Sequence, residues 1–193
     1  MIVHARQVVA GIALLLATAI LPPCPHAAVL AQAGTVEILF TPGDAIDRRI
    51  VAAIDTAHDQ IHVLAYAFTH QGIADALVAA RSRGVEVIVV ADRTQALELP
   101  HTMMPELRRR GIDVSLDHGP GNAHNKVVIV DPRSAHPTTI TGSFNFTRAA
   151  QARNAENVVI FRGNRDVARL YEQYFQRRRA IAQPAGETAQ SRR

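Results

Sequence analysis

The chain has 193 residues, of which 48% are hydrophobic and 20% charged, with a formal net charge of +4. This is the balance of an ordinary globular protein, and the length suits one domain whose core is stable without disulfide bonds. The sequence has no Trp and only 5% aromatic residues, which argues against the base-stacking platform of single-strand-binding proteins.

The first 33 residues have the pattern of an export signal. Val8–Leu21 is an unbroken apolar run preceded by Arg6, and prolines and the small-x-small triplet Ala31-Gln32-Ala33 follow it. This order predicts a signal peptide over residues 1–33, cleaved after Ala33 or after Ala28, with a retained anchor as the alternative. The apolar run is short for a membrane span, which needs about 20 residues. We therefore expect an exported protein, periplasmic or secreted, without stable membrane insertion after cleavage.

The predicted mature chain has no thiol, because the only cysteine, Cys24, lies inside the signal segment. Disulfides and cysteine catalysis are therefore excluded for it. Without Arg6, 20 of the 21 Lys and Arg residues remain against 17 Asp and Glu. This mildly positive charge is compatible with a polyanionic substrate but does not require one.

Strand and helix patterns alternate from residue 34 to residue 116. Four apolar runs predict strands: Val36–Phe40, Ile61–Phe68, Val85–Ala91 and Ile112–Leu116. Three segments with apolar residues at helical spacing lie between them: residues 46–57, 71–83 and 105–110. We expect Asp44 and Thr69 to cap the first two helices, and Gly84 and Gly111 to end the second and third. The order predicts an α/β fold, a three-layer α/β/α sandwich with a mixed, largely parallel central sheet.

The second half of the chain predicts more strands and one long helix. Ala123–Val130 and Thr138–Thr141 are expected to form a hairpin, and Val158–Phe161 a last strand. Asp166–Arg179 carries its apolar residues on one helical face. The domain is expected to span residues 34–181, followed by a disordered polar tail over residues 182–193.

The most informative motif is His-x-Lys-x4-Asp, formed by His124, Lys126 and Asp131. Alternate residues of a strand share a face, so His124 and Lys126 are expected to point the same way and Asp131 the opposite way. An ammonium group neutralises the oxygens of a phosphate diester, while an imidazole attacks phosphorus or moves a proton. The pair therefore indicates phosphodiester chemistry, with a strand-end surface pair as the alternative.

Three further candidates follow the motif. Ser143 and Asn145, in the run Gly142-Ser143-Phe144-Asn145, are two residues apart and can both donate hydrogen bonds to a phosphate, or they are simply turn residues. A nucleophilic histidine needs an acceptor at its second ring nitrogen. Asp131 and Glu156 are the candidate catalytic carboxylates for this role. Strand parity favours Glu156 and leaves Asp131 with structural hydrogen bonds at its strand end.

Together these residues resemble the phospholipase D superfamily, and the chain is most similar to its small bacterial endonucleases with one such motif per chain. The likeness runs from Val36 to Arg178. It implies a covalent phosphohistidine at His124, a phosphate held by Lys126 and Asn145 with Ser143 close by, and Glu156 orienting His124. It implies no metal and no other cofactor.

The resemblance also implies a partner. Members of the family supply the general acid as a second histidine from a second motif, and this chain has one motif. The second histidine is therefore expected to be His124 of another copy, in a homodimer with the active site shared across the two-fold axis. The expected function is a metal-independent phosphodiesterase, a non-specific endonuclease acting on nucleic acid. A phospholipase D acting on phospholipid headgroups is the alternative, and a non-enzymatic binding module is a third reading that intact His124, Lys126 and Glu156 argue against.

Other polar and aromatic residues carry weaker signals. Six further histidines, His58, His62, His70, His101, His118 and His136, lack the spacing of metal ligands. The run Arg177-Arg178-Arg179 is either a contact to a nucleic-acid backbone or a solvated helix end. Tyr66 and Phe68 are expected to lie in the core.

Overall fold

The computed structural model describes residues 30–31 and 33–185. Its strands are β1 (Thr35–Thr41), β2 (Gln60–Ala65), β3 (Glu86–Asp92), β4 (Asp113–Asp117), β5 (Lys126–Val130), β6 (Thr138–Gly142), β7 (Glu156–Arg162) and β8 (Ala182–Pro184). Its helices are α1 (Ile46–Asp55), α2 (Gln71–Ser82), α3 (Arg93–Glu98), α4 (Met104–Arg109), α5 (Arg148–Ala152) and α6 (Arg165–Ile181). The predicted signal peptide lies outside the described residues apart from Leu30, Ala31 and Ala33. No helix within the described ranges is both long enough and apolar enough to cross a membrane.

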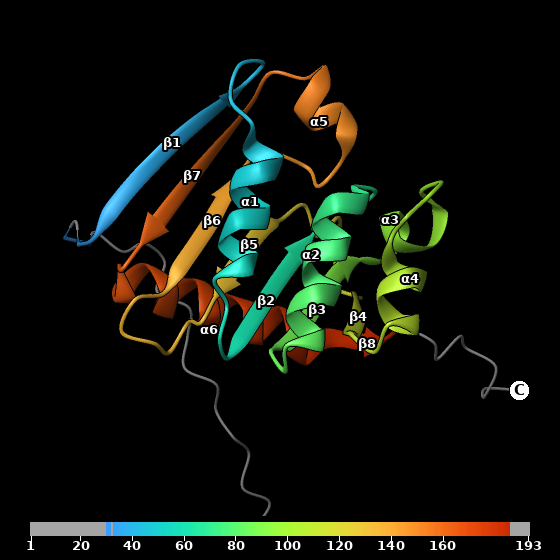
Figure 1. Cartoon of the computed structure of the whole chain (residues 1–193). Helices are drawn as coiled ribbons and strands as arrows, with labels where there is room; N and C mark the ends of the chain where they lie inside the picture. Colours follow the sequence, from blue (N-terminus) through green and yellow to red (C-terminus); the bar gives the residue numbers. More distant parts are fainter. Residues whose placement is uncertain (1–29, 32, 186–193) are drawn as a thin grey trace, which may run out of the picture.

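The strands form one mixed sheet in the order β1-β7-β6-β5-β2-β3-β4-β8 (Figure 1). Helical crossovers make β2, β3 and β4 parallel neighbours. The other neighbouring pairs of the described sheet are antiparallel, because β5 and β6 form a hairpin and β7 returns between β6 and β1. The sheet is therefore mixed, as predicted, but its parallel part is limited to three strands, and β1 lies at an edge rather than beside β2.

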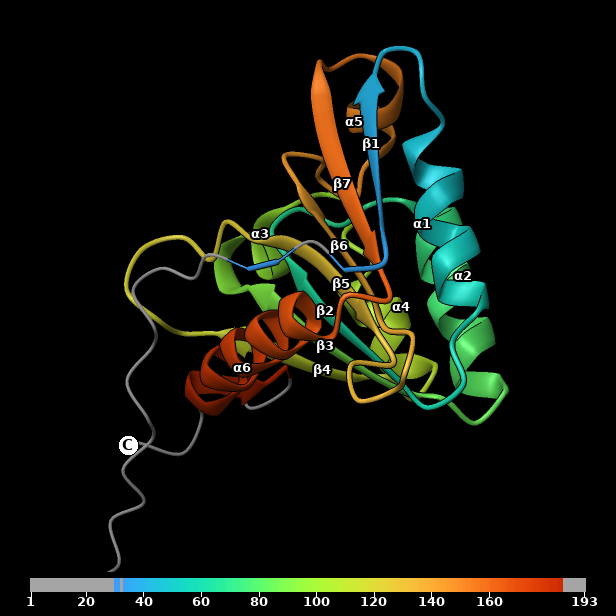
Figure 2. The ribbon, with the colours of Figure 1, turned by 90° about the vertical axis from the view of Figure 1, so that its left-hand side faces the viewer.

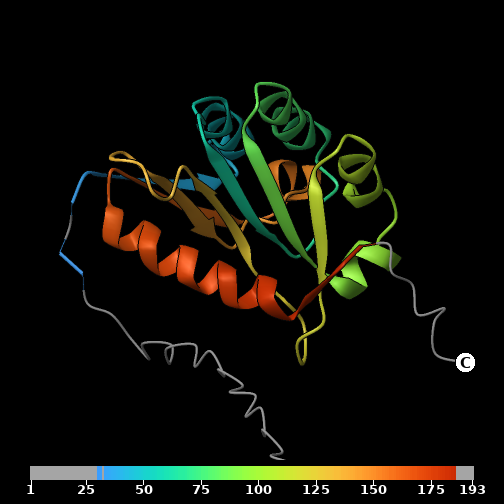
Figure 3. The same cartoon turned by 90° about the horizontal axis from the view of Figure 1, so that it is seen from below.

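The sheet is covered on both faces, which confirms the predicted three-layer α/β/α sandwich. Figure 3 shows α1, α2 and α4 on one side of the sheet and α6 on the other. Alternation along each strand supplies both cores. Val63, Val89 and Val128 are buried with the α1 and α2 residues, whereas Leu64 and Val127 are buried with Phe175 of α6.

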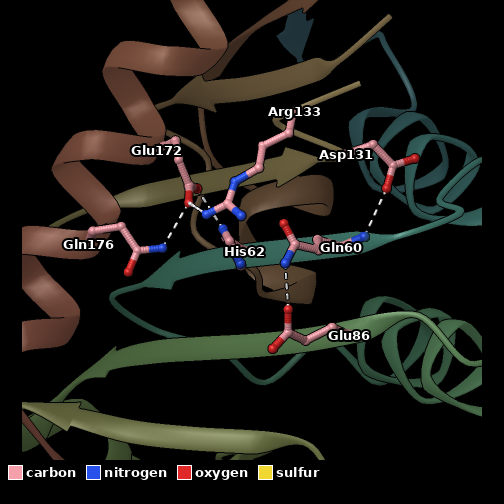
Figure 4. Close-up of polar contacts among 7 residues, drawn as sticks. All are labelled: Gln60, His62, Glu86, Asp131, Arg133, Glu172 and Gln176. Carbon is pink, nitrogen blue, oxygen red and sulfur yellow. Dashed lines mark hydrogen bonds and ion pairs between the residues drawn. The ribbon is translucent and has the colours of Figure 1, made fainter. Parts of the chain in front are cut away.

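Helix α6 is fixed to its face by a buried polar contact as well as by apolar packing. The ring of His62 in β2 stacks parallel on Phe175 at a centroid distance of 4.3 Å. Its Nδ1 lies 2.6 Å from Oε2 of Glu172 (Figure 4). Burial raises the pKa of Glu172, but hydrogen bonds from His62 and Gln176 outweigh it, so that the pKa of this carboxyl lies below its ordinary value. The side chain of Glu172 is therefore a carboxylate, and it binds His62 on the face of the sheet that α6 covers.

Several local predictions need correction. Asp44 does not cap α1; its Oδ2 accepts from the Phe40 backbone N–H at 2.8 Å and closes the preceding turn. His70, not Thr69, caps α2. Gly84 and Gly111 end their helices with φ of +95° and +78°, as predicted. The predicted tail begins as strand β8, which pairs with β4, and residues 186–193 lie outside the described residues.

The outer part of the sheet, formed by β1 and β7, extends beyond α6 (Figure 2). Val36, Ile38 and Phe40 alternate along β1, and the register from Ile38 through β7 and β6 to Val127 puts them on the α6 face. They are 40%, 58% and 58% exposed. We call these three side chains the β1 apolar stripe.

Candidate active site

The predicted site residues converge at one end of the strands of the sheet, where β2 and β3 end and β5 begins. We call it the site edge. Ala65, the last residue of β2, pairs with Lys126, the first residue of β5. Tyr66 follows β2 directly, and His124 lies in the loop that leads into β5. The carboxyl ends of parallel strands are the usual location of sites in α/β folds.

His124 is exposed and lies in a loop rather than on the predicted strand, which begins only at Lys126. The side chains of His124 and Lys126 nevertheless point toward the same place, as expected. Nδ1 of His124 lies 2.9 Å from Nζ of Lys126, and the ammonium also donates to the His124 carbonyl oxygen at 3.0 Å. The two predicted catalytic groups therefore contact each other within one chain.

Lys126 is buried although it is charged, with 6% of its surface exposed. Burial lowers the pKa of its ammonium group below the ordinary value, and the negative charge of Glu156 partly opposes this shift. A poorly hydrated ammonium beside an exposed imidazole is suited to neutralising an incoming phosphate.

Tyr66 completes this group and was not predicted as a site residue. Its ring centroid lies 4.3 Å from that of His124 at an interplanar angle of 57°. The Lys126 ammonium lies 4.8 Å from the same ring centroid, within cation–π range. The aromatic ring thus contacts both members of the pair. The strand pattern could not reveal this, because Tyr66 follows β2 at the point where the chain leaves the sheet.

The segment between β6 and α5, residues 143–147, is held at the site edge by backbone hydrogen bonds. The Phe146 N–H donates to the Ala67 carbonyl oxygen at 3.1 Å, and the Phe146 carbonyl oxygen accepts from the N–H groups of Thr69 and His70, each at 2.9 Å. At its start, a Cβ on Gly142 would lie 2.1 Å from the carbonyl oxygen of Asn157, so only glycine fits there.

Asn145 lies within this segment and has an unusual environment. Its side-chain Oδ1 is buried and finds no hydrogen-bond partner among the described residues. Buried amide groups are normally paired, and a ligand is one explanation of an exception. Because an amide oxygen accepts hydrogen bonds and a phosphate oxygen does so too, this atom does not itself point to a phosphate. The predicted phosphate-binding role of Asn145 would use its amide NH2 group and stays a prediction.

Ser143 and Glu156 contact each other rather than His124. The Ser143 hydroxyl donates to Oε2 of Glu156 at 2.5 Å, and Asn154 Nδ2 donates to Oε1 at 2.9 Å. A hydroxyl has one proton to donate. In this state Ser143 therefore positions Glu156, and its contact to a phosphate stays a prediction. The same holds for the orientation of His124 by Glu156, since the carboxylate is near Lys126 but no contact to His124 of the same chain is observed among the described residues.

Asp131 is not brought into the site. It lies at the opposite end of β5 and adopts a left-handed backbone conformation with φ of +47°. Its carboxylate accepts from the backbone N–H groups of His58, Asp59 and Gln60 at 2.9, 2.8 and 2.9 Å. Figure 4 shows the contact with Gln60. Asp131 was predicted among the candidate catalytic residues, but it lies at the end of β5 away from the site. Its contacts are those of a structural residue that fixes the start of β2.

The arginine run at the end of α6 is engaged within the fold. Arg178 makes two hydrogen bonds to the carboxylate of Asp117, at 2.7 and 2.6 Å. Arg179 pairs with Asp113 at 3.0 Å, and the Arg177 guanidinium lies 5.7 Å from the Tyr174 ring centroid. The run is therefore not a purely solvated helix end, and its contact with a nucleic-acid backbone stays a prediction. In the described part of the chain, no three His, Cys, Asp or Glu residues are grouped to hold a metal ion.

Comparison with known proteins places this geometry in a family. Residues 50–179 match the family model described as "Cardiolipin synthase, PLD-like domain". The chain belongs to the phospholipase D superfamily. It is 42% identical over 145 residues to a protein named phospholipase D from Rickettsia felis, covering 75% of this chain and 70% of the relative. The resemblance seen in the motifs is thereby confirmed.

Further relatives extend this phospholipase D assignment. The mitochondrial cardiolipin hydrolase of Homo sapiens is 34% identical over 135 residues, covering 70% of this chain and 51% of the relative. Among solved structures, Nuc from Salmonella typhimurium, a phospholipase D family member, superposes with a TM-score of 0.71 and 32% identity, covering 78% of this chain and 97% of Nuc. The protein is a phosphodiesterase of the phospholipase D superfamily.

Proposed function

We propose that the protein hydrolyses phosphodiester bonds without a metal ion, through a phosphohistidine at His124, and that nucleic acid is its substrate. The observation that carries the chemistry is the contact of the exposed His124 imidazole with the buried Lys126 ammonium, 2.9 Å apart. The ammonium lies where it can neutralise the non-bridging oxygens of a diester. The amide NH2 group of Asn145 would supply a further donor for the phosphate.

In the first step, Nε2 of His124 attacks phosphorus, a P–N bond forms, and the bond from phosphorus to the leaving oxygen breaks. The leaving alcohol takes a proton from a second histidine. Water then attacks phosphorus, passes a proton to that second histidine, and the P–N bond breaks. The products are one phosphate monoester and one alcohol, and both histidines return to their starting states.

The second histidine is assigned to His124 of another copy of the chain. The state of a single subunit supports this assignment. An ammonium donating to Nδ1 leaves the proton of the neutral imidazole on Nε2, so Nε2 lacks the free lone pair that attack on phosphorus needs. A nucleophilic Nε2 requires a carboxylate acceptor at Nδ1. We assign that role to Glu156 in the assembled dimer, where its carboxylate would leave Ser143 and Asn154.

The β1 apolar stripe supports a dimer through this part of the sheet. Val36, Ile38 and Phe40 lie side by side on a face that α6 leaves open. Apolar side chains gathered on one face of a monomer mark interaction surfaces. The β1 strand ends at Thr41 on the site edge, where its partner in β7 is Glu156. A second copy packed on the stripe would therefore bring its own site edge toward the first.

Nucleic acid is favoured as the substrate by the charges around the site. Arg93 follows β3 directly, Arg148 begins α5, and Arg153 follows α5, so all three lie at the site edge. Each is exposed, and none makes a salt bridge with a described residue. Unpaired arginines beside a diester site suit a polymer with many phosphates, and contacts to phosphates alone carry little sequence preference.

A phospholipid headgroup is the second candidate substrate. It is favoured by relatives whose printed names refer to lipids, phospholipase D of Rickettsia felis and mitochondrial cardiolipin hydrolase of Homo sapiens. The same His124 and Lys126 chemistry would serve it. We further propose export to the periplasm or the medium, because residues 1–33 have the pattern of a signal peptide. A chain purified from the periplasm or medium that begins at Gly34 would support this.

The test is cleavage of plasmid DNA and of phosphatidylcholine vesicles by the purified protein, with excess chelator present. We expect DNA cleavage that persists in chelator and disappears in His124→Ala. The matched control is His58→Ala, the same substitution at an exposed histidine beyond the opposite end of β5, which should cleave like wild type. Cleavage of vesicles but not DNA would transfer the function to phospholipids, and loss of activity in chelator would refute the metal-independent mechanism.

Salt dependence separates a polymeric substrate from a small one. Replacing Arg93, Arg148 and Arg153 by Gln should reduce DNA cleavage and flatten its dependence on salt concentration, by a slope of about one for each phosphate that is no longer bound. Hydrolysis of the small diester bis(4-nitrophenyl) phosphate should be unaffected. Arg110→Gln, at the edge of the sheet opposite to the site, should change neither. An unchanged salt slope in the triple variant would contradict nucleic-acid binding at this edge.

A further inference from the structure

The loop that carries His124 spans Gly119–Asn125, and we call it the nucleophile loop. It follows β4 and crosses to β5. The strands β3 and β4 end in aspartates, Asp92 and Asp117, which are direct neighbours in the parallel pairing. Both are buried, at 3% and 5% exposure. Two buried carboxylates at the ends of adjacent strands need partners, and each finds a backbone N–H of this loop.

Asp117 fixes the beginning of the nucleophile loop. Its Oδ1 accepts from the Gly119 N–H at 2.8 Å, while Arg178 of α6 binds both carboxylate oxygens. The loop passes so close to this ion pair that a Cβ on Gly119 would lie 2.5 Å from Nη2 of Arg178. A side chain at this position would have to displace the Arg178 guanidinium. The start of the loop is thus anchored to β4 and α6 together.

Asp92 fixes the end of the loop. Its Oδ1 accepts from the Gln95 N–H at 2.9 Å and caps α3. Its Oδ2 accepts from the Ala123 N–H at 2.8 Å. Ala123 directly precedes His124. A helix cap uses one oxygen, so the second oxygen of Asp92 makes a separate contact, one residue away from the proposed nucleophile.

We propose that Asp92 is a positioning residue for His124, and that with Asp117 it holds the nucleophile loop in its reactive geometry. The inference rests on the proposed function of His124. No strand or helix fixes the His124 backbone. Besides the contact of Lys126 with the His124 carbonyl oxygen, the loop is held by these two carboxylates. Errors of about 1 Å in the placement of a reacting group cost up to about 100-fold in rate, which gives the contact its importance.

Asp92→Asn separates the two contacts of this side chain. Asn is as good a helix cap as Asp, but its amide has one acceptor oxygen, and its NH2 group would meet the Ala123 N–H donor to donor. Asp92→Ala removes both contacts. The matched control is Asn164→Ala, which deletes the buried cap of α6, where Oδ1 accepts from the Val167 N–H at 3.0 Å, without touching the nucleophile loop.

The readouts are kcat and KM for bis(4-nitrophenyl) phosphate and hydrogen exchange of peptides that cover the nucleophile loop. Both Asp92 variants should lose about 10- to 100-fold in kcat with KM changed less than about threefold, and the loop should exchange faster. Asn164→Ala should lose stability but keep kcat and the exchange rate of the loop. A folded Asp92→Ala variant with wild-type kcat would overturn the inference. If wild type itself hydrolyses no diester, the proposed function fails, and the exchange rates alone decide whether Asp92 holds the loop.

Discussion

Nζ of Lys126 lies 2.9 Å from Nδ1 of His124, although Lys126 opens strand β5 and His124 belongs to the loop before it. The ammonium is therefore held by the sheet, while the imidazole reaches it from a segment fixed by side chains. The charge of the pair depends on the protonation of a buried lysine, which makes the reaction sensitive to pH on the alkaline side.

Glu156→Gln should move the alkaline limb of the pH–rate profile to lower pH. Burial lowers the pKa of Lys126, and Glu156 opposes this shift, so removal of the carboxylate lowers the pKa further. The active ammonium is then lost at lower pH as pH rises. The measurement is kcat against pH with a small chromogenic diester. Glu86→Gln, at the start of β3 and therefore at the end of that strand away from the site, should leave the alkaline limb at the same pH. An alkaline limb that stays at the same pH or moves to higher pH in Glu156→Gln would contradict the assignment of Lys126.

Tyr66→Leu should lower kcat by about 2- to 30-fold, because a cation–π contact contributes about 0.5–2 kcal/mol and the ring contacts both His124 and Lys126. Tyr66→Phe keeps the ring and should stay within about threefold of wild type. Steady-state kinetics of the two variants, with urea unfolding as a check on stability, tests this. Equal losses in both variants would show that the hydroxyl rather than the ring matters.

Asp131→Ala should destabilise the protein by about 2–4 kcal/mol, since three partly buried backbone N–H donors lose a charged acceptor. Alanine also tolerates the left-handed conformation poorly. The folded variant should keep its kcat. Urea denaturation and kinetics measure the two effects, with Asp55→Ala on the exposed face of α1 as the control. A loss of kcat at unchanged stability would return Asp131 to the catalytic residues.

Ile38→Glu combined with Phe40→Glu should dissociate the proposed dimer by placing charges on the β1 apolar stripe. Sedimentation velocity should show a monomer with reduced activity at concentrations where wild type is dimeric. Leu97→Glu alters another exposed apolar residue, 60% exposed on α3, and should leave the dissociation constant unchanged. A fully active double variant that remains dimeric would exclude this face as the interface.

Much of the fold could be predicted from local patterns. The runs at Ile61–Phe68 and Val85–Ala91 are long and apolar enough to identify buried strands, and Gly84 marks a helix end by its left-handed φ. Short elements gave no such signal. Helix α3 spans only six residues and β8 only three. The antiparallel place of β1 depends on pairing with β7, more than 100 residues away along the chain, which no periodicity encodes.

The part of the site that was predicted correctly lies in one short segment of the sequence. His124 and Lys126 are two residues apart, and their contact follows from that spacing. Strand parity argued against Asp131, but the structure separates it from His124 for another reason: Asp131 lies beyond the opposite end of β5, and His124 is not on the strand. Asp92 and Tyr66 were missed, because each reaches the nucleophile through tertiary contacts at the ends of different strands. Neither residue differs in type from an ordinary helix cap or core aromatic.

Strand β8 has a consequence for how copies of this chain can associate. By pairing with β4 it occupies one border of the sheet with three residues ending in Pro184, and so short a strand with a terminal proline is a poor template for another. Among the described strands, the border formed by β1 is the longer one, with seven residues. A sheet that can be extended on one side alone cannot grow into a filament, so any edge-to-edge pairing of copies through β1 would end at two.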